Sequence, residues 1–193
     1  NLYEIADING FFTDSGLKIK LEKTSAATVF QDTAANLIDV LGKVESYTGP
    51  VRATSAVGAD EINTLAGLTT GVVTGIITSA AVDSALVASL TNVKTTDKIS
   101  FASTAATAKA TDIVALKAKL PLANFSSIPT INGTSDDVAA LKSAANIVKS
   151  AAVTIAPGEI SAANANALAK ISSKIVTATV TAGSAAALKS ALA

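Results

Sequence analysis

The sequence lacks several residue types on which enzymes and metalloproteins depend. It contains no cysteine, histidine, methionine or tryptophan, and only five Phe and two Tyr among 193 residues. Without cysteine there is no disulfide, thiolate nucleophile or Cys-ligated metal, and without histidine the commonest general base and metal ligand is missing. So few aromatic rings give no stacking platform for nucleic acid. These absences predict a protein that is not an enzyme and has no cofactor.

Charged residues are also scarce: Asp, Glu, Lys and Arg together make up 16% of the chain. Their charges cancel to a net charge of zero. A neutral chain offers no electrostatic basis for binding nucleic acid or an anionic membrane. The surface is therefore expected to consist largely of Ser, Thr, Asn and Ala. The absence of methionine predicts a processed protein or a piece of a longer one. The absence of cysteine favours an extracellular, bacterial cell-surface location.

No motif supplies a catalytic or metal-binding group. The Ser-x-x-Lys pattern at Ser15–Lys18 has no partner motifs of the acyl-transfer enzymes that use it, and a turn explains it. The adjacent carboxylates Asp60-Glu61 and Asp136-Asp137 are explained as helix caps. Neither a glycine-rich phosphate loop nor a calcium loop is present. We therefore predict no catalytic, cofactor-binding or metal-binding residues.

One apolar run, Gly71–Leu90, has the length of a membrane span and a single charge at Asp83. Ser and Thr residues interrupt it, its first half is β-branched, and an Asp near a bilayer centre is costly. The run also matches a strand-plus-helix unit found elsewhere in the chain. We therefore expect no membrane insertion.

Two copies of one unit follow each other at Ser135–Pro157 and Gly158–Gly183, and a third begins at Ser184. Each full copy opens with an acidic residue, continues through an Ala-rich segment around Leu141 or Leu168, and closes in alternating Val/Ile and Thr/Ala. The first pattern predicts a helix and the second a short strand. The same helix–strand pattern recurs over most of the chain.

About six helix–strand repeats result, with a period of about 25 residues, which is typical of α/β solenoids. The predicted helices centre near Leu37, Leu65, Leu86, Leu116, Leu141 and Leu168, with another begun at Leu188, and the predicted strands near Ala53, Thr74, Ser100, Pro129, Thr154 and Ala178.

Several boundaries are predicted from local signals. The first helix is expected at about Ser25–Val44 and to be the longest, because Phe30 and the leucines after it form one apolar stripe. Glu159 is expected to start a helix, and Pro157-Gly158 to mark a junction between units. Pro129 lies inside a predicted strand, which must then be short or irregular.

Two regions are expected: residues 1–24 as an N-terminal cap or junction containing a strand at Leu17–Leu21, and residues 25–193 as the repeats. The final repeat is incomplete, because its helix has no following strand. An unfinished repeat exposes a strand edge. We therefore expect it to continue into more chain or to dock against another subunit.

The repeats predict an α/β fold. Successive parallel strands need a crossover of about a dozen residues, usually a helix, and such crossovers are right-handed. We predict a right-handed α/β solenoid with a parallel sheet on one side and Ala-rich helices on the other. The sheet's outer face is the candidate binding face, lined by Thr74, Ser100, Thr154, Thr177 and Thr179. A helical bundle in which the Val-Thr-Ala-Thr stretches are linkers remains an alternative.

Three segments, Phe30–Leu37, Ala59–Thr74 and Ile175–Thr181, resemble the Ala/Thr-rich tandem repeats of very large bacterial, notably cyanobacterial, secreted cell-surface proteins. These include giant adhesins, RTX-related exported proteins and surface-layer proteins. The resemblance covers the chain from about Thr24 onward and implies a mechanical or adhesive role with no catalytic residues. The calcium-binding nonapeptides typical of RTX proteins are absent here.

The expected function is a non-catalytic stalk, surface-layer or filament building block that associates with itself or with neighbouring repeats. The alternative is an adhesive module that binds carbohydrate or another cell-surface ligand through the Thr-lined face.

Overall fold

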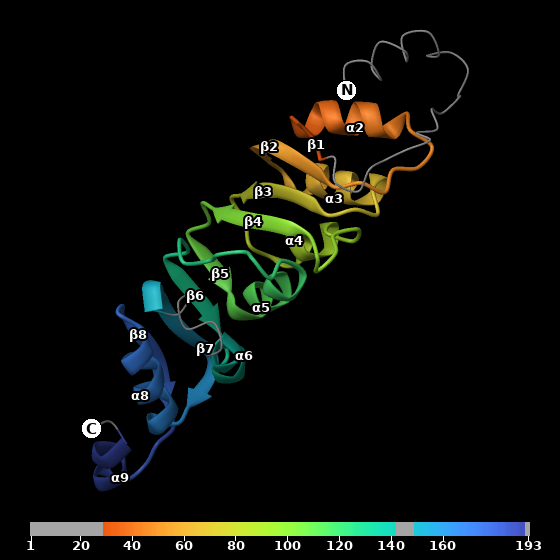
Figure 1. Cartoon of the computed structure of the whole chain (residues 1–193). Coiled ribbons are helices and arrows are strands. Elements are labelled where there is room, and N and C mark those ends of the chain that lie inside the picture. Colours follow the sequence, from red (N-terminus) through yellow and green to blue (C-terminus); the bar gives the residue numbers. More distant parts are fainter. Residues whose placement is uncertain (1–28, 142–148, 192–193) are drawn as a thin grey trace. The chain divides into compact units, whose positions relative to one another are not determined.

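A computed structural model describes residues 29–141 and 149–191, in which strands and helices alternate along the chain (Figure 1). The elements of the first half are β1 (Phe30–Asp32), α2 (Ala34–Gly42), β2 (Val51–Val57), α3 (Ala59–Leu68), β3 (Val73–Ser79), α4 (Ser84–Ser89) and β4 (Lys98–Ser103). Those of the second half are β5 (Thr107–Lys109), α5 (Ala110–Lys119), β6 (Thr130–Gly133), α6 (Ser135–Ala140), β7 (Ala152–Ile160), α8 (Ala162–Ile171), β8 (Val176–Val180) and α9 (Ala185–Ala191).

The described residues group into two compact units. The first holds residues 29–78, 88–101 and 119–122, and the second holds residues 79–87, 102–118, 123–141 and 149–191. One four-stranded sheet has the order β1-β2-β3-β4, and the other has the order β5-β6-β7-β8. The pairs β1/β2, β2/β3, β5/β6, β6/β7 and β7/β8 are parallel. The fold is therefore α/β with parallel sheets, as predicted.

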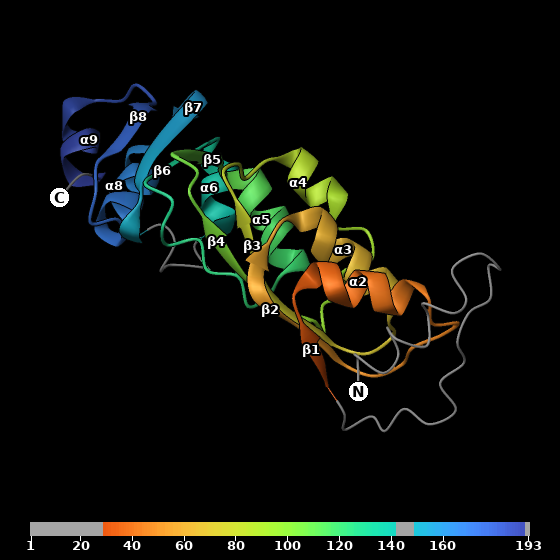
Figure 2. The ribbon, with the colours of Figure 1, turned by 90° about the horizontal axis from the view of Figure 1, so that it is seen from above.

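Each sheet has one buried face and one face that is open to solvent. Along β3 and β4, Val73, Ile77 and Ile99 are buried, while Ile76 and Ser100 beside them are exposed. Figure 2 shows α2 and α3 on the same side of β1 and β2, where they pack against each other. The helices thus cover the apolar face, and the opposite face stays accessible, with mostly polar side chains and the exposed Ile76.

The helix leucines fill the space between the helices and the sheets. Leu37, Leu65 and Leu116 have no exposed surface, and Leu168 is 2% exposed. Burying one such side chain stabilises a fold by about 1.5–3 kcal/mol. Helices and strands lie at or next to the predicted centres, which confirms the alternation. The strand β8 contains the Val-Thr-Ala-Thr stretch, so the alternative of a helical bundle with linkers is wrong.

The predicted helix at Ser25–Val44 is wrong at Phe30–Asp32, and residues 25–28 lie outside the described residues. Phe30–Asp32 forms β1, paired with Val51–Ala53, and α2 begins only at Ala34. The cause is local: the Asp32 carboxylate accepts the Thr33 amide at 2.7 Å, and the Thr33 hydroxyl accepts the Asn36 amide at 3.3 Å as the N-cap. With nine residues, α2 is shorter than α3, α5 and α8.

The predicted junction at Pro157-Gly158 and the predicted helix start at Glu159 are also wrong, because both lie within β7. The pairing with β8 shifts register between Ile155 and Glu159, and Gly158 has φ +116°, which a glycine adopts without strain. Residues 156–158 have no partner on β8 and form an irregular, three-residue bulge, after which Ile160 pairs with Val180. The helix α8 begins at Ala162, capped by Ser161.

Two further differences concern short strands. The strand β5 was not predicted, and β6 begins directly after Pro129 instead of containing it. Pro129 still contributes its carbonyl, which accepts the Ala152 amide at 2.8 Å. Leu141 is the C-cap of α6 rather than its centre. The predicted strand at Leu17–Leu21 and the predicted cap at 1–24 lie outside the described residues.

The apolar run Gly71–Leu90 forms β3, a turn and α4, as the strand-plus-helix interpretation predicted. Among the described residues, no helix is both long and apolar enough to span a bilayer.

Candidate functional site

The predicted binding face divides between the two sheets. Thr74 and Ser100 lie on the first sheet, and Thr154, Thr177 and Thr179 lie on the second. Thr74 and Thr154 are half-buried and the other three are exposed, so all five are accessible on the outer faces. Each sheet therefore carries a candidate face of its own.

On the first sheet, one row of outward residues crosses three strands. Gln31 is the register partner of Arg52, which in turn is the partner of Thr74. Ser100 adds a hydroxyl, which donates to the Gly75 carbonyl at 3.4 Å. The row joins an amide, a guanidinium and hydroxyls, groups that can hydrogen-bond a polar ligand.

On the second sheet, the corresponding row runs through Lys109, Asn132, Thr154 and Thr177 in register. The neighbouring inward row, Ala108, Ile131, Val153 and Val176, is apolar. This alternation is the two-residue period of a half-buried strand, on which the prediction of the face was based. Thr179 is the partner of Glu159, beyond the bulge of β7.

Polar side chains that the sequence did not single out are buried between helices and strands. Within the part of the chain that the structure describes, the buried polar residues are Thr69, Asp97 and Ser172. All three lie in a turn that leads into a strand. The Thr69 hydroxyl donates to the Gly49 carbonyl at 2.7 Å, and the Ser172 hydroxyl donates to the Ala151 carbonyl at 3.0 Å. Each bond reaches back to the turn before the preceding strand.

Asp97 also bonds back to an earlier part of the chain, but its carboxylate accepts hydrogen bonds where the Thr69 and Ser172 hydroxyls donate them. Its two carboxylate oxygens accept the Val73 amide at 2.9 Å and the Lys94 amide at 2.8 Å. Val73 is the first residue of β3, so this bond also ties one turn to the preceding strand. We name Thr69, Asp97 and Ser172 the junction residues. A Thr, Asp or Ser between a predicted helix and the strand after it is the signal that could have found them.

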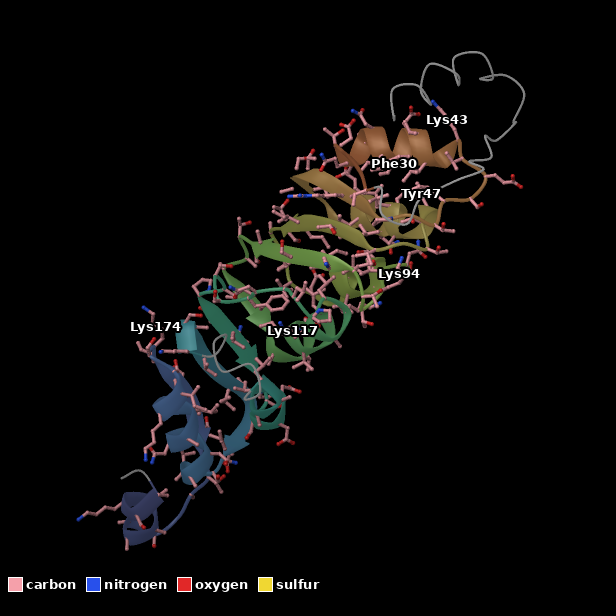
Figure 3. All side chains as sticks on the ribbon, in the orientation of Figure 1. Phe30, Lys43, Tyr47, Lys94, Lys117 and Lys174 are labelled. Atoms are coloured by element: carbon pink, nitrogen blue, oxygen red, sulfur yellow. The ribbon has the colours of Figure 1, made fainter. Side chains whose placement is uncertain are left out.

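Lysines reinforce these turns (Figure 3). The Lys94 ammonium donates to the Thr69 carbonyl at 3.2 Å, and the Lys119 ammonium donates to the Leu90 carbonyl at 2.8 Å. Both carbonyls follow the C-terminal end of a preceding helix, where a positive charge is favourable. These lysines therefore join consecutive repeats and do not need a ligand to explain them.

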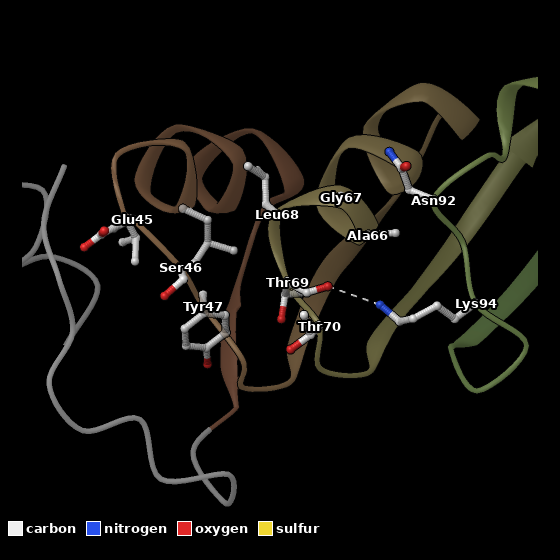
Figure 4. Close-up of a pocket in the computed structure, with 12 residues that line it drawn as sticks. Glu45, Ser46, Tyr47, Ala66, Gly67, Leu68, Thr69, Thr70, Asn92 and Lys94 are labelled. Carbon is white, nitrogen blue, oxygen red and sulfur yellow. Dashed lines mark hydrogen bonds between the residues drawn. The ribbon is translucent and has the colours of Figure 1, made fainter. Parts of the chain in front are cut away.

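A cavity of about 570 Å³ opens beside these turns in the first unit (Figure 4). Its wall includes Leu41, Tyr47, Thr70, Asn92 and Lys94. Lys94 is engaged by the Thr69 carbonyl and lies 3.8 Å from the Asp97 carboxylate. Burial raises the pKa of the Tyr47 phenol, which stays protonated at neutral pH and donates to the Pro50 carbonyl at 3.3 Å. The wall contains no nucleophile paired with a base.

A second cavity, of about 430 Å³, lies in the second unit and is lined by Asp83, Lys109, Asp112 and Asn132, among others. The Asp83 carboxylate caps α4 by accepting the Leu86 amide at 2.9 Å, and Asp112 lies in the first turn of α5. Helix capping therefore explains both carboxylates. Over the described ranges, no three acidic residues come close enough to hold a metal ion.

The two carboxylate pairs noted in the sequence also cap helices. Glu61 accepts the Gly58 amide at 3.1 Å at the start of α3, and Asp137 accepts the Thr134 amide at 3.0 Å at the start of α6. The capping interpretation is confirmed for these two residues. Ser15 and Lys18 lie outside the described residues.

Comparisons with protein-family models, with curated proteins and with solved structures find no match for this chain.

Proposed function

We propose that this chain is a non-catalytic structural segment of an extracellular bacterial surface protein, acting as a stalk, surface layer or filament building block. The observation that carries the proposal is the recurrence of the junction residues. A buried polar side chain in the turn after α3, α4 and α8 bonds back to the turn before the preceding strand or to the start of that strand, at Thr69, Asp97 and Ser172. Such a chain of nearest-neighbour contacts is what a load-bearing repeat protein requires.

The topology supports a right-handed α/β solenoid as the architecture. In both sheets the strand order follows the chain order, and the parallel neighbours within each sheet are linked through helices. Right-handed crossovers in one direction place every helix on the same face of a sheet. This agrees with sheets that are buried on one face only.

Alanine supports the same architecture. Strands stack about 4.8 Å apart, whereas helix axes usually lie about 8–10 Å apart, so a row of bulky helices would curve a sheet strongly. The helix α8 has the sequence AANANALAKI, and α9 has the sequence AAALKSA. Small side chains let neighbouring helices approach and reduce this mismatch. Together with the Thr-rich outer faces and the resemblance to bacterial surface repeats, this favours an extended structural role.

Hydrogen exchange of a matched pair of variants tests the repeat architecture. Thr69→Val removes a junction hydroxyl, whereas Thr70→Val changes an exposed hydroxyl next to it. We expect Thr69→Val to lower amide protection in β2 and β3 most, with the loss fading along the chain, and Thr70→Val to change little. A uniform loss of protection over all described elements would contradict a repeat with nearest-neighbour stability.

Electron microscopy of the purified chain at increasing concentration, with and without calcium, tests the role as a building block. Ordered filaments or sheets are expected. Particles that stay short and monodisperse in every condition would rule out self-assembly by this segment.

An adhesive function is the second candidate, because the row Lys109, Asn132, Thr154 and Thr177 presents polar groups in register on an outer face. A glycan array tests it. Binding that Thr177→Val abolishes, and that Thr78→Val on the other sheet leaves intact, would favour adhesion.

A further inference from the structure

The cavity of about 430 Å³ in the second unit lies where β5 and β6 end. Lys109 is the last residue of β5, and its register partner Asn132 is the second-last residue of β6. The loop before α4 and the first turn of α5 complete the wall, and every lining residue belongs to the second unit. The carboxyl ends of parallel strands are the usual place for a ligand in an α/β sheet.

The polar side chains of this wall are not used up by the fold. Within the part of the chain that the structure describes, the side chains of Lys109, Asp112 and Asn132 make no hydrogen bond or ion pair. Asp83 uses one carboxylate oxygen to cap α4, and the second oxygen can accept another bond. The wall therefore offers an ammonium donor, carboxylate acceptors and an amide that both donates and accepts.

The cavity in the first unit differs in this respect. Its lysine, Lys94, donates to the Thr69 carbonyl, and its phenol, Tyr47, donates to the Pro50 carbonyl. A ligand there would have to break these bonds. The cavity at the ends of β5 and β6 is thus the better candidate for a binding site.

The rest of the wall restricts the class of ligand. Most of it is small and aliphatic, and it contains no aromatic ring on which a nucleobase could stack. Asp83 and Asp112 outnumber Lys109, so an anion such as phosphate would meet a net negative charge. The volume is in the range of about 300–1,000 Å³ that is usual for small-molecule sites. The aliphatic residues are Ala80, Ala81, Val82, Ala106 and Ala108.

We infer that this cavity binds a neutral saccharide of one or two rings. Each sugar hydroxyl donates and accepts, so it matches a wall in which Asp112 accepts, Lys109 donates and Asn132 does both. The C–H groups of the ring pack against the alanines. A longer glycan can continue from Asn132 to its register partner Thr154 on the outer face. This binding activity goes beyond the proposed structural role and does not depend on assembly.

Titration of the ¹⁵N-labelled chain with the methyl glycosides of glucose, galactose, mannose and N-acetylglucosamine tests the inference by NMR. We expect at least one glycoside to shift the amides of residues 80–84, 106–112 and 132. The expected dissociation constant is about 1 mM, as for a ligand of this size held by a few hydrogen bonds. Methyl glucuronide and inorganic phosphate, which are anions, are expected to leave these amides unshifted.

Matched variants locate the binding in the cavity. Asp112→Asn and Asn132→Ala are each expected to raise the dissociation constant about tenfold. Asp136→Asn removes an exposed carboxylate from the first turn of α6, outside the wall, and is expected to change it less than about twofold. Ala106→Phe fills the cavity without removing a polar group and is expected to abolish binding. Ala163→Phe, at an exposed position on α8, is its control.

Three results would overturn the inference. The first is no shift at these amides with any of the four glycosides at about 50 mM, about fifty times the expected dissociation constant. The second is an effect of methyl glucuronide or phosphate that equals that of the neutral glycosides. The third is binding that Thr177→Val removes and Asp112→Asn leaves intact, which would place the glycan on the outer row instead of in the cavity.

The outcome is independent of the proposed structural function. A chain that forms filaments or sheets in electron microscopy but shifts no amide of the cavity loses the saccharide site alone. A chain that binds a glycoside in the cavity but stays short and monodisperse keeps the site and loses the role as a building block.

Discussion

Replacing Asp97 with alanine is the sharpest perturbation of the junctions. The Asp97 side chain has no exposed surface, and its two oxygens accept the Val73 and Lys94 amides at 2.9 and 2.8 Å. Asp97→Ala leaves both N–H groups without these acceptors, and Val73 is fully buried, so water cannot easily replace the carboxylate. Each buried donor left unsatisfied costs about 1–3 kcal/mol.

The ion pair with Lys94 adds little to this loss. Its atoms are 3.8 Å apart and the Lys94 side chain is 34% exposed, so solvent screens the attraction to less than about 1 kcal/mol. We therefore expect Asp97→Ala to lower the free energy of unfolding by about 3 kcal/mol. Asp97→Asn keeps one acceptor and is expected to cost about 2 kcal/mol.

Urea unfolding followed by circular dichroism measures this effect. With a slope of about 2 kcal/mol per molar, a loss of about 3 kcal/mol lowers the midpoint by about 1.5 M. The control is Asp60→Ala, which removes an exposed carboxylate from the first turn of α3 and is expected to cost less than about 1 kcal/mol. Equal losses in the two variants, or an unchanged exchange rate of the Val73 amide, would refute the reasoning.

Three further outcomes are expected. Leu116→Ala, at a site with no exposed surface, should cost about 2–5 kcal/mol in urea unfolding; Val114→Ala, on the exposed side of α5, should cost less than about 1 kcal/mol. Ser172→Ala should cost about 1–2 kcal/mol, because the Lys174 amide loses its acceptor and the Ala151 carbonyl its donor; a loss no larger than that of the exposed variant Ser126→Ala would contradict this. Burial raises the pKa of Tyr47 above 10.0, so above pH 10 the unfolded chain loses its phenol proton first. The free energy of unfolding should then fall with rising pH, and the part due to this phenol should be absent in Tyr47→Phe.

Local patterns in the sequence were sufficient to predict the alternation of helices and strands. Leucines with helical spacing and Val/Thr alternation are signals within one element, and both depend on which side chains face the core. Leu65 and Val73 are buried as these patterns require. The five predicted face residues are accessible for the same reason, since a strand with one buried face must expose alternate residues.

The errors arose where two local signals competed or where the deciding partner lay far away. Phe30 fits a helical stripe with Leu37, but pairing with Val51 and stacking on Tyr47, with ring centroids 4.9 Å apart, place it in a strand. Pro157-Gly158 is a common break between elements, but here it forms a bulge inside β7. The junction residues resemble ordinary turn residues until their partners 20 to 24 positions earlier are known.

We expect the junction residues to help similar strands pair with their correct neighbours. The strands share a Val/Thr/Ala composition, so pairing a strand with the wrong repeat would lose little apolar burial. Thr69 and Ser172 donate to carbonyls, whereas Asp97 accepts from amides, so the turn with Asp97 cannot replace either of the other two.

Thr69→Asp tests this idea, because it places a carboxylate where the Gly49 carbonyl needs a donor. The Asp carboxylate and the Gly49 carbonyl, both acceptors, then face each other in a buried site, where the carboxylate charge is desolvated. We expect Thr69→Asp to destabilise the fold more than Thr69→Val, by at least about 1 kcal/mol. Equal midpoints in urea for the two variants would mean that the junctions fill space without selecting the register.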